Sequence, residues 1–504
     1  MLKGNLLNMK RFALFVSSII LITVAQASAA EDVVTRAMKL YEKRHYGEAA
    51  SMLRADSASV EQGKKGAASL SLGMIYFRNA VLHRELYQTS VSASKDYLKK
   101  LSAVQGKDRS HFVDLYFGQA LLESGKPVAA AIYLEKFSAT EGVEPRYRAI
   151  AKVCLGLGYS QDHASAKTAK LWGGISTSDP EVKAELAAAY SKAGLVGKNP
   201  FPSADGILSE MNKSGKPLSI RMVKNLVAIC ARESELTEKG LDLLERSDLK
   251  AFSYQETLGK SKMIRFYDPS LLNEMAILYG RASLACLERA AADPKVKAAA
   301  EFYLGQAYAL FGSVEQSSKV TTSFMATSTM PEQYKDRIMV WEAANLYRRN
   351  RQADAVAVWD GLVQKKPEDP DLVAEILFAC SALKIECPKV LQKAAAMVEI
   401  GDGKRFSQLN AAIGKYYLGR LDDSRAISYL EAGRDKSNKN KIESNDPMLL
   451  VSLAEAYYRT KKFSEALEIY FEMSKQFPEV RQIQEAIQGV YAMEHKSAGD
   501  VKIN

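Results

Sequence analysis

The chain has 504 residues, of which 47% are hydrophobic and 25% are charged, and it contains 14 prolines, 30 glycines and five cysteines. This composition is typical of an ordered helical protein and excludes a disordered chain, while so few cysteines exclude a fold built on disulfides. The formal net charge of +10 falls by three to +7 when a predicted signal segment with Lys3, Lys10 and Arg11 is removed, and this mild surplus without a concentrated basic stripe disfavours nucleic acid as a partner.

The amino end has the pattern of a secretory signal. Lys10 and Arg11 precede an apolar run over residues 12–24, and the small residues at 27–29 provide a signal-peptidase site. The run is too short for a comfortable membrane-spanning helix, and no second long apolar segment follows it. We therefore predict a signal peptide over residues 1–29, cleavage after Ala29, and a periplasmic or secreted mature chain with no stable membrane span. An uncleaved, retained anchor is the alternative.

Residues 30–198 carry small, apolar and aromatic residues at a spacing that recurs along the chain. A first helix pair is marked by Ala37, Leu40, Tyr46, Ala49 and Leu53, with Arg44 at a turn position where glycine is common. A clearer unit at residues 116–125 corresponds residue by residue to 303–312. Weaker copies are marked by Leu72, Gly73 and Tyr76, by Gly156, Tyr159 and Trp172, and by Ala187, Tyr190 and Gly194.

The repeated pattern fades over residues 199–269, which prolines and glycines divide into shorter pieces. Helical periodicity continues over 218–233 and 236–246, so we predict divergent helices there. Residues 251–268 have no helical stripe and are predicted to form a long loop. Its aromatic and basic residues are a candidate contact element: Phe252, Tyr254, Arg265, Phe266 and Tyr267. In the alternative interpretation these aromatics fold back and cover a groove or a helix end.

The repeated spacing resumes over residues 270–494. A long amphipathic helix is predicted over 270–292, and further units follow at 303–312, 337–367 and 414–430. The tail at 495–504 is short and polar. The clearest unit lies at 446–479 and is marked by Leu450, Leu453, Ala454 and Tyr457 on its first helix, by Phe463, Ala466 and Tyr470 on its second, and by Pro478 at its end.

The unit is about 34 residues long, with small residues where two helices approach each other and aromatic residues between helix pairs, and in this it resembles the tetratricopeptide repeat (TPR). The resemblance implies an all-α fold, an α-solenoid of stacked antiparallel helix hairpins in a TPR-like superhelix. Its domains are then an N-terminal TPR-like array at 30–198, a divergent helical or loop region at 199–269 and a C-terminal TPR-like array at 270–494. Any all-helical protein has apolar residues at helical spacing, but only a solenoid explains the recurring period.

In such a solenoid, the first helices of the pairs line an inner wall that binds other molecules, and the TPR resemblance implies protein partners. In the alternative interpretation the wall side chains fill gaps between repeats, which suits the tyrosines and the tryptophan best. Some TPR proteins hold a carboxyl-terminal peptide through Lys, Asn and Arg on successive first helices, and only Arg337 matches here, so that mode is disfavoured. Matching repeat positions give these candidate partner-binding residues: Tyr116, Gln119, Tyr303, Gln306, Trp341, Lys415 and Glu455.

Two of the five cysteines, Cys380 and Cys387, flank the predicted turn of one helix hairpin. Facing each other across that turn, they are a hypothetical disulfide. The alternative is a pair of thiols that act as small buried hydrophobic residues. The sequence leaves both interpretations open.

No catalytic or metal-binding pattern accompanies the repeats. The five histidines are far apart, and the glycine motifs for phosphate and dinucleotide binding are absent, so no metal, cofactor or catalytic residue is predicted. The leading hypothesis is an exported, noncatalytic scaffold that recruits proteins during envelope assembly, secretion or surface polymer export. Recognition of envelope polysaccharide by the inner wall is the competing hypothesis, and a cell-wall-active enzyme is the third.

Overall fold

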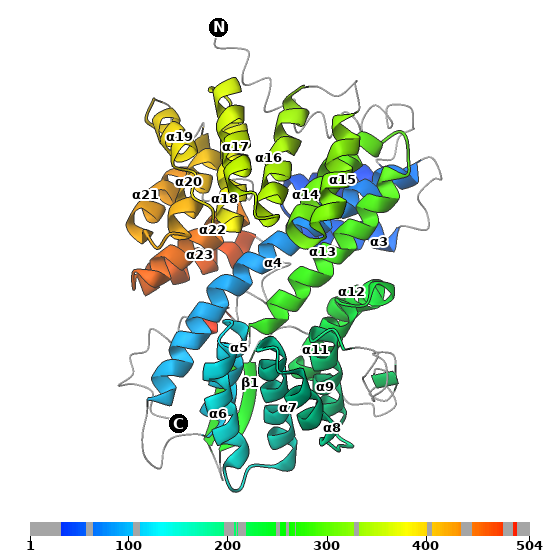
Figure 1. Ribbon diagram of the computed structural model, residues 1–504, viewed down its shortest axis with the longest axis vertical. Coiled ribbons are helices and arrows are strands. Elements are labelled where there is room, and N and C mark those ends of the chain that lie inside the picture. Colours follow the sequence, from blue (N-terminus) through cyan, green and yellow to red (C-terminus); the bar gives the residue numbers. More distant parts are fainter. Residues whose placement is uncertain are drawn as a thin grey trace. The chain divides into compact units, whose positions relative to one another are not determined.

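The computed structural model describes residues 32–56, 64–103, 111–195, 206–207, 209, 218–247, 253–258, 262–267, 269–326, 332–400, 406–434, 446–476 and 487–490. Helices dominate this part of the chain, and most follow one another through short turns (Figure 1). The predicted signal segment, Phe252 and the predicted tail at 495–504 lie outside the described residues. In the part that is described, no helix combines the length and the apolar character needed to cross a membrane.

The chain divides by compactness into two units, each made of two separate chain segments. Unit 1 comprises the described residues of 1–79 and 280–462, and unit 2 comprises those of 80–279 and 463–504. Two long helices, α4 (Lys65–Ser102) and α13 (Ser270–Ala291), contribute to both units. The predicted division of the chain at residues 198 and 269 is based on sequence repeats. The compact units do not test it, because each of them combines segments that are distant in the sequence.

Unit 2 contains the helix pairs that follow α4. Neighbouring helices pack in chain order, with α5 on α6, α6 on α7, and α7 on both α8 and α9. The helices are α5 (Phe112–Glu123), α6 (Pro127–Ala139), α7 (Pro145–Gln161), α8 (Ser165–Gly173), α9 (Pro180–Lys192), α11 (Ile220–Cys230), a 3-10 turn at Ser234–Leu236, α12 (Thr237–Arg246) and α23 (Phe463–Gln476). Both helices predicted in the divergent region are confirmed, because α11 and α12 lie within their predicted ranges.

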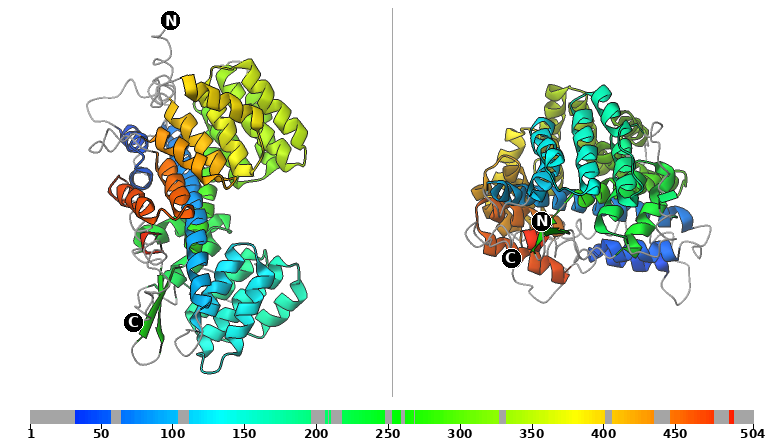
Figure 2. Two further views of the ribbon diagram at one scale, coloured as in Figure 1. Left: turned by 90° about the vertical axis from the view of Figure 1, so that its left-hand side faces the viewer. Right: turned by 90° about the horizontal axis from the view of Figure 1, so that it is seen from below.

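Unit 1 contains the amino-terminal pair and most of the C-terminal array. Its first helices α14, α16, α18, α20 and α22 pack side by side, and the second helices pack on them (Figure 2). The helices are α2 (Val33–Glu42), α3 (Tyr46–Ala55), α14 (Lys297–Phe311), α15 (Val314–Met325), α16 (Glu332–Arg348), α17 (Gln352–Lys365), α18 (Pro370–Leu383), α19 (Pro388–Ile400), α20 (Ser407–Leu418), α21 (Asp423–Gly433) and α22 (Pro447–Arg459).

A single residue in the left-handed conformation closes many of the described hairpin turns. The backbone N–H that follows it donates back to the last helical turn, for example from Lys126 to the Leu121 carbonyl at 2.9 Å. This pattern satisfies carbonyl groups that the helix end leaves without partners, and it reverses the chain in two or three residues. The left-handed residues of these turns have φ between 57° and 70° and are Arg44, Gly125, His163, Gly194, Asn350, Lys384, Leu421 and Lys461.

Two buried tryptophans occupy matching places in the two units. Trp172 Nε1 donates to the Val153 carbonyl, and Trp359 Nε1 donates to the Val340 carbonyl, both at 3.1 Å. In each case the indole belongs to the second helix and packs against the first helix of the same pair, and the tryptophan is at most 1% exposed. The predicted repeat therefore recurs at the level of individual hydrogen bonds.

The weak repeat predicted at Leu72, Gly73 and Tyr76 is wrong, because these residues lie within the uninterrupted helix α4. No glycine or proline follows Gly73 until after the end of α4, so nothing in the sequence breaks the helix. The glycine instead permits a close approach of α13, where Ser283 Oγ donates to the Gly73 carbonyl at 2.7 Å.

The predicted long loop at 251–268 is also wrong over most of its length. β1 (Ser253–Leu258) and β2 (Lys262–Tyr267) form an antiparallel hairpin, with Tyr254 opposite Phe266 and Gln255 opposite Arg265. Aromatic and β-branched residues favour extended strands, which explains the missing helical stripe. Outside this hairpin, the secondary structure of the described residues is helical, and the all-α class is confirmed.

Candidate functional site

We call the surface formed by α14, α16, α18, α20 and α22 of unit 1 the first-helix wall. The aspartate cap at the start of α18 sets the position of its central helix. Asp369 Oδ1 accepts the backbone N–H groups of Asp371 and Leu372 at 3.2 and 3.1 Å, and Pro370 occupies the first helical position. An aspartate cap followed by proline specifies where a helix begins, and so it fixes which side chains face the neighbouring helices.

Glu375 on α18 is the centre of a hydrogen-bonded cluster on this wall. Its Oε2 accepts a bond from Arg337 Nε at 2.6 Å, and its Oε1 accepts bonds from Trp341 Nε1 at 2.8 Å and Gln306 Nε2 at 3.2 Å. Arg337 and Trp341 come from α16 and Gln306 comes from α14. One carboxylate therefore ties three successive first helices together, and two of the predicted partner-binding residues share it.

The Glu375 cluster is partly accessible to solvent. The side chains of Arg337 and Glu375 are 21% and 11% exposed. Burial alone would lower the pKa of Arg337, but the Glu375 carboxylate raises it above its usual value, so the guanidinium keeps its charge. Asp371, one turn earlier on α18, has a raised pKa because of burial, which Arg337 opposes and Asp369 reinforces.

Three other predicted wall residues lie in unit 1 outside the Glu375 cluster. Lys415 Nζ lies 4.5 Å from the ring centroid of Phe378, and both side chains are half-buried. Glu455 pairs with Arg459 of its own helix at 3.7 Å. Tyr303 is half-buried, and burial raises the pKa of its hydroxyl. Cationic, anionic and aromatic groups therefore follow one another along the first-helix wall.

Unit 2 has a second cluster, centred on Glu185 of α9. Glu185 Oε2 accepts a bond from Asn225 Nδ2 at 2.8 Å and lies 3.5 Å from Arg221 Nη1, while Oε1 lies 3.7 Å from Lys224 Nζ. These three partners are all on α11. Arg221 Nη2 also donates to Tyr116 Oη on α5 at 3.0 Å. The predicted wall residue Tyr116 is therefore part of a buried polar network.

This second cluster is almost completely buried. The side chains of Arg221, Lys224 and Glu185 are 3%, 6% and 9% exposed. Burial would raise the pKa of Glu185, but Lys224 and Arg221 lower it below its usual value. The carboxylate is therefore ionised in the interior, where it is stable only while its partners are present.

The long helices α4 and α13 add further buried polar contacts to unit 2. Glu274 on α13 is 1% exposed and lies 2.8 Å from Lys192 Nζ at the end of α9, and it also pairs with Arg232. Tyr87 on α4 donates to Glu123 Oε2 at 2.9 Å at the end of α5. Lys192 and Arg232 lower the pKa of Glu274 against the opposing effect of burial.

Gln119 is the remaining predicted wall residue in unit 2. Its Nε2 lies 3.3 Å from Cys154 Sγ on α7. Burial, reinforced by Glu185, raises the pKa of the Cys154 thiol to about 12, so this cysteine is an unreactive, protonated acceptor. Gln119 and Tyr116 thus contact buried groups of neighbouring first helices.

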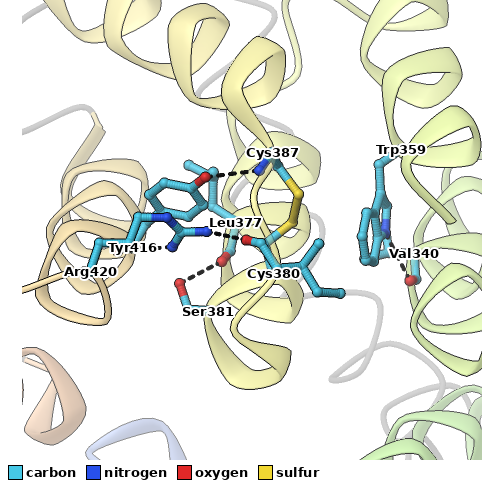
Figure 3. The surroundings of a disulfide bond; sticks show 9 residues. Val340, Trp359, Leu377, Cys380, Ser381, Cys387, Tyr416 and Arg420 are labelled. Atoms are coloured by element: carbon cyan, nitrogen blue, oxygen red, sulfur yellow. Dashed lines mark hydrogen bonds between the residues drawn. A yellow bond between two sulfur atoms is a disulfide. The ribbon is translucent and has the colours of Figure 1, made fainter. Parts of the chain in front are cut away.

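The structure joins Cys380, near the end of α18, to Cys387, just before α19, in a disulfide (Figure 3). Their Cα atoms are 6.7 Å apart, and both residues are at most 1% exposed. The disulfide is one of the two interpretations that the sequence leaves open. Cys154, Cys230 and Cys286 are buried and take part in no disulfide.

The predicted contact residues Tyr254, Arg265, Phe266 and Tyr267 lie on β1 and β2, in a hairpin and not in a loop. Phe252 lies outside the described residues. Within the described ranges, no three His, Cys, Asp or Glu side chains gather closely enough to hold a metal ion.

Our sequence interpretation missed the carboxylates at the centres of both clusters. Glu185 and Glu375 each follow an Asp-Pro pair, at 179–180 and 369–370, by five residues. In both helices the aspartate caps the first turn and the proline follows it. This shared spacing is a sequence signal that would have identified both glutamates.

Comparison with protein families and with curated proteins finds no match to the chain. Solved structures give matches of low identity. Yeast Tom70 is 12% identical over 92% of this chain and 94% of its own, with a TM-score of 0.32. The TPR domain of P58(IPK) is 14% identical over 76% and 98%, with a TM-score of 0.18. The APC/C hetero-tetramer Cut9-Hcn1 is 12% identical over 95% and 98%, with a TM-score of 0.27.

All three TM-scores are below 0.5, so we base the fold class on the hairpins themselves and not on these superpositions. The left-handed turns, the matching tryptophans and the packing of first helix on first helix define an α-solenoid of TPR-like helix pairs. Stacked repeats of this kind present an extended surface to other molecules.

Proposed function

We propose that the protein is an exported, noncatalytic scaffold whose first-helix wall in unit 1 recruits one or more proteins. The observation that carries this proposal is the Glu375 cluster. It fixes three successive helices by hydrogen bonds while leaving Arg337 and Glu375 21% and 11% exposed. A rigid surface with partly accessible charged groups loses little conformational entropy when a partner binds, and this favours affinity.

Protein is a better partner for this wall than polysaccharide. Sugar recognition would require aromatic rings with accessible faces, but the Trp341 side chain of this wall is 6% exposed. Its ring is used in packing and in the hydrogen bond to Glu375. The half-buried groups that remain, Phe378 with Lys415 among them, suit protein side chains of mixed character.

The proposed location is the periplasm or the outside of the cell. The signal pattern at residues 1–29 supports export. The disulfide between Cys380 and Cys387 is consistent with it, because structural disulfides persist mainly in oxidising compartments. In that setting a scaffold would recruit proteins for envelope assembly, secretion or surface polymer export.

Crosslinking in the native envelope, followed by identification of captured proteins, tests this function. The test variant combines Lys415→Glu with Glu455→Lys, which exchanges two wall charges without a change in net charge. The control is Lys389→Glu with Asp360→Lys, which does the same to an ion pair between the second helices α19 and α17. We expect the wall variant to lose its specific captured protein at least about tenfold and the control to keep it.

Three results would overturn the proposal. The wall variant and the control would capture the same proteins equally, the wild-type chain would bind glycan and capture no protein, or the purified chain would turn over a substrate and lose that activity on a single carboxylate or serine substitution.

A further inference from the structure

We propose that the Cys380–Cys387 disulfide is a redox-sensitive crosslink. By closing the α18–α19 turn it keeps α20 packed against this turn, and its reduction releases α20. The inference concerns the fold of unit 1 and does not depend on the partner-binding function. Its basis is that α20 contacts the backbone of the disulfide-closed turn and not only the side chains of α18 and α19.

Tyr416 of α20 binds one end of the turn. Its Oη accepts the backbone N–H of Cys387 at 2.8 Å, and the phenol is 3% exposed (Figure 3). A hydrogen bond to a buried backbone N–H is sensitive to the conformation of that residue, because the peptide unit fixes the direction of the N–H. This contact therefore requires the particular path that the chain takes through Cys387.

Arg420, two residues beyond the end of α20, binds the middle of the same turn. Its guanidinium lies 3.4 Å from the ring centroid of Tyr416, and it donates to the carbonyls of Ile385 and Tyr416. The turn itself is tight, because Ile385 N–H donates back to the Cys380 carbonyl at 2.8 Å and Lys384 has a φ of 57°. Tyr416 near the end of α20 and Arg420 just beyond it thus contact two backbone positions of the turn, 387 and 385.

The disulfide makes this turn conformation permanent. It joins two residues seven positions apart, so the intervening segment cannot straighten while the bond is closed. Cys154, Cys230 and Cys286 are also buried but take part in no disulfide, so burial alone does not account for the bond between 380 and 387.

Reduction would proceed by thiol–disulfide exchange with a dithiol. A thiolate of the dithiol attacks one sulfur, the bond between the two cysteines breaks, and the dithiol closes into its own disulfide while Cys380 and Cys387 each gain a proton as thiols. Since both residues are at most 1% exposed, attack requires local opening of the turn. The disulfide is therefore reduced slowly: it resists brief exposure to a reductant and is reduced on prolonged exposure.

Hydrogen exchange measured by mass spectrometry on the full mature chain tests the proposal. The wild-type protein is compared before and after complete reduction with dithiothreitol, and alkylation records the state of each cysteine. We expect exchange in peptides covering 385–400 and 407–420 to accelerate by about tenfold or more after reduction, while peptides from α5 to α9 keep their rates.

Two variants distinguish loss of the contact between α20 and the turn from a general loss of structure. Tyr416→Phe keeps the disulfide but removes the acceptor of the Cys387 N–H, so exchange should accelerate at 387 and in α20 while alkylation finds no free thiol at 380 or 387. Tyr417→Phe is the matched control, because it removes a hydroxyl from the next residue, whose partner is Arg425, and it should leave the turn unchanged.

The proposal is overturned if oxidised and fully reduced wild-type proteins exchange at the same rates over 385–420. It is also overturned if the oxidised, denatured protein contains free thiols at both Cys380 and Cys387.

Discussion

Glu375 of unit 1 and Glu185 of unit 2 occupy the same position, the sixth residue of a helix whose first residue is a proline preceded by an aspartate cap. They differ in which neighbouring first helix supplies their hydrogen-bond donors. The donors to Glu375 come from the preceding first helices, and those to Glu185 come from the following one. The same repeat position thus serves two kinds of cluster. In unit 2 it belongs to a buried ionic network, whereas in unit 1 it belongs to a cluster that is partly accessible to solvent.

The difference in burial explains the difference in role. Arg221 and Lys224 around Glu185 are 3% and 6% exposed, but Arg337 beside Glu375 is 21% exposed. A buried charge is stable only with its partners, so the buried polar groups of unit 2 are required for its folded structure. The groups of unit 1 can exchange part of their solvent contact for a partner. This difference supports the proposal that the first helices of unit 1 bind partners, while those of unit 2 stabilise the fold.

The largest effect that we predict is the loss of a buried carboxylate in unit 2. Glu274→Gln leaves Lys192 and Arg232 without their counter-charge, and we expect the free energy of unfolding of unit 2 to fall by about 3 kcal/mol. The matched change Glu375→Gln in unit 1 should cost about 1 kcal/mol, because Arg337 can still reach water. Urea unfolding followed by hydrogen exchange of peptides from each unit measures both. Equal losses in the two units would contradict the comparison.

A second prediction concerns pH. Glu185 and Glu274 have pKa values lower in the folded protein than in the unfolded chain. The unfolded state therefore takes up protons first as the pH falls. The stabilisation is fully present above the ordinary glutamate pKa of about 4.3 and is lost as the pH falls through the folded pKa values.

We expect unit 2 to lose stability more steeply than unit 1 between pH 5 and pH 3, by roughly 1–2 kcal/mol. Urea midpoints measured at several pH values, again by peptide-resolved exchange, would reveal this. The variant Glu274→Gln should reduce the slope for unit 2. A slope that the substitution leaves unchanged would mean that other groups control the acid response.

The smallest predicted effect compares the hairpin turns of the two units. Leu421 in unit 1 has a φ of 64° and is 78% exposed, so Leu421→Gly should stabilise unit 1 by about 1 kcal/mol, because glycine adopts this conformation without strain. Gly125 in unit 2 has a φ of 68°, and Gly125→Ala should destabilise unit 2 by a similar amount. Thermal unfolding followed by circular dichroism checks the signs. A gain from both substitutions, or a loss from both, would show that φ does not dominate at these turns.

The repeat itself could be predicted from the sequence because its determinants are local. Small residues at helix contacts and aromatics such as Trp359 recur at fixed spacing, and they mark the helix pairs directly. Arg44 could likewise be placed in a turn, although glycine is common there, because the residues around it keep the repeat spacing. The unbroken helix α4 could not be predicted, since Gly73 matches a glycine in the first helix of other repeats, such as Gly414, and here permits contact with α13.

The clusters could be predicted only in part, because their residues come from different repeats. Trp341 and Gln306 were placed on the wall by repeat position, but their common acceptor Glu375 lies 34 and 69 residues away. Which neighbouring helix supplies the donors depends on how each pair stacks, and no single repeat contains that information. The hairpin at 253–267 was interpreted as a loop, since it has neither a helical stripe nor a repeat.

Site-specific photo-crosslinking in the native envelope tests whether the first-helix wall of unit 1 binds proteins. A photoreactive amino acid is placed at Phe378 on the wall of unit 1, at Gln119 on a first helix of unit 2, and at Ile132, which is 65% exposed on a second helix of unit 2. The account predicts one or more specific protein adducts at position 378 and none at 119 or 132. Adducts at 119 or 132 with none at 378 would contradict it.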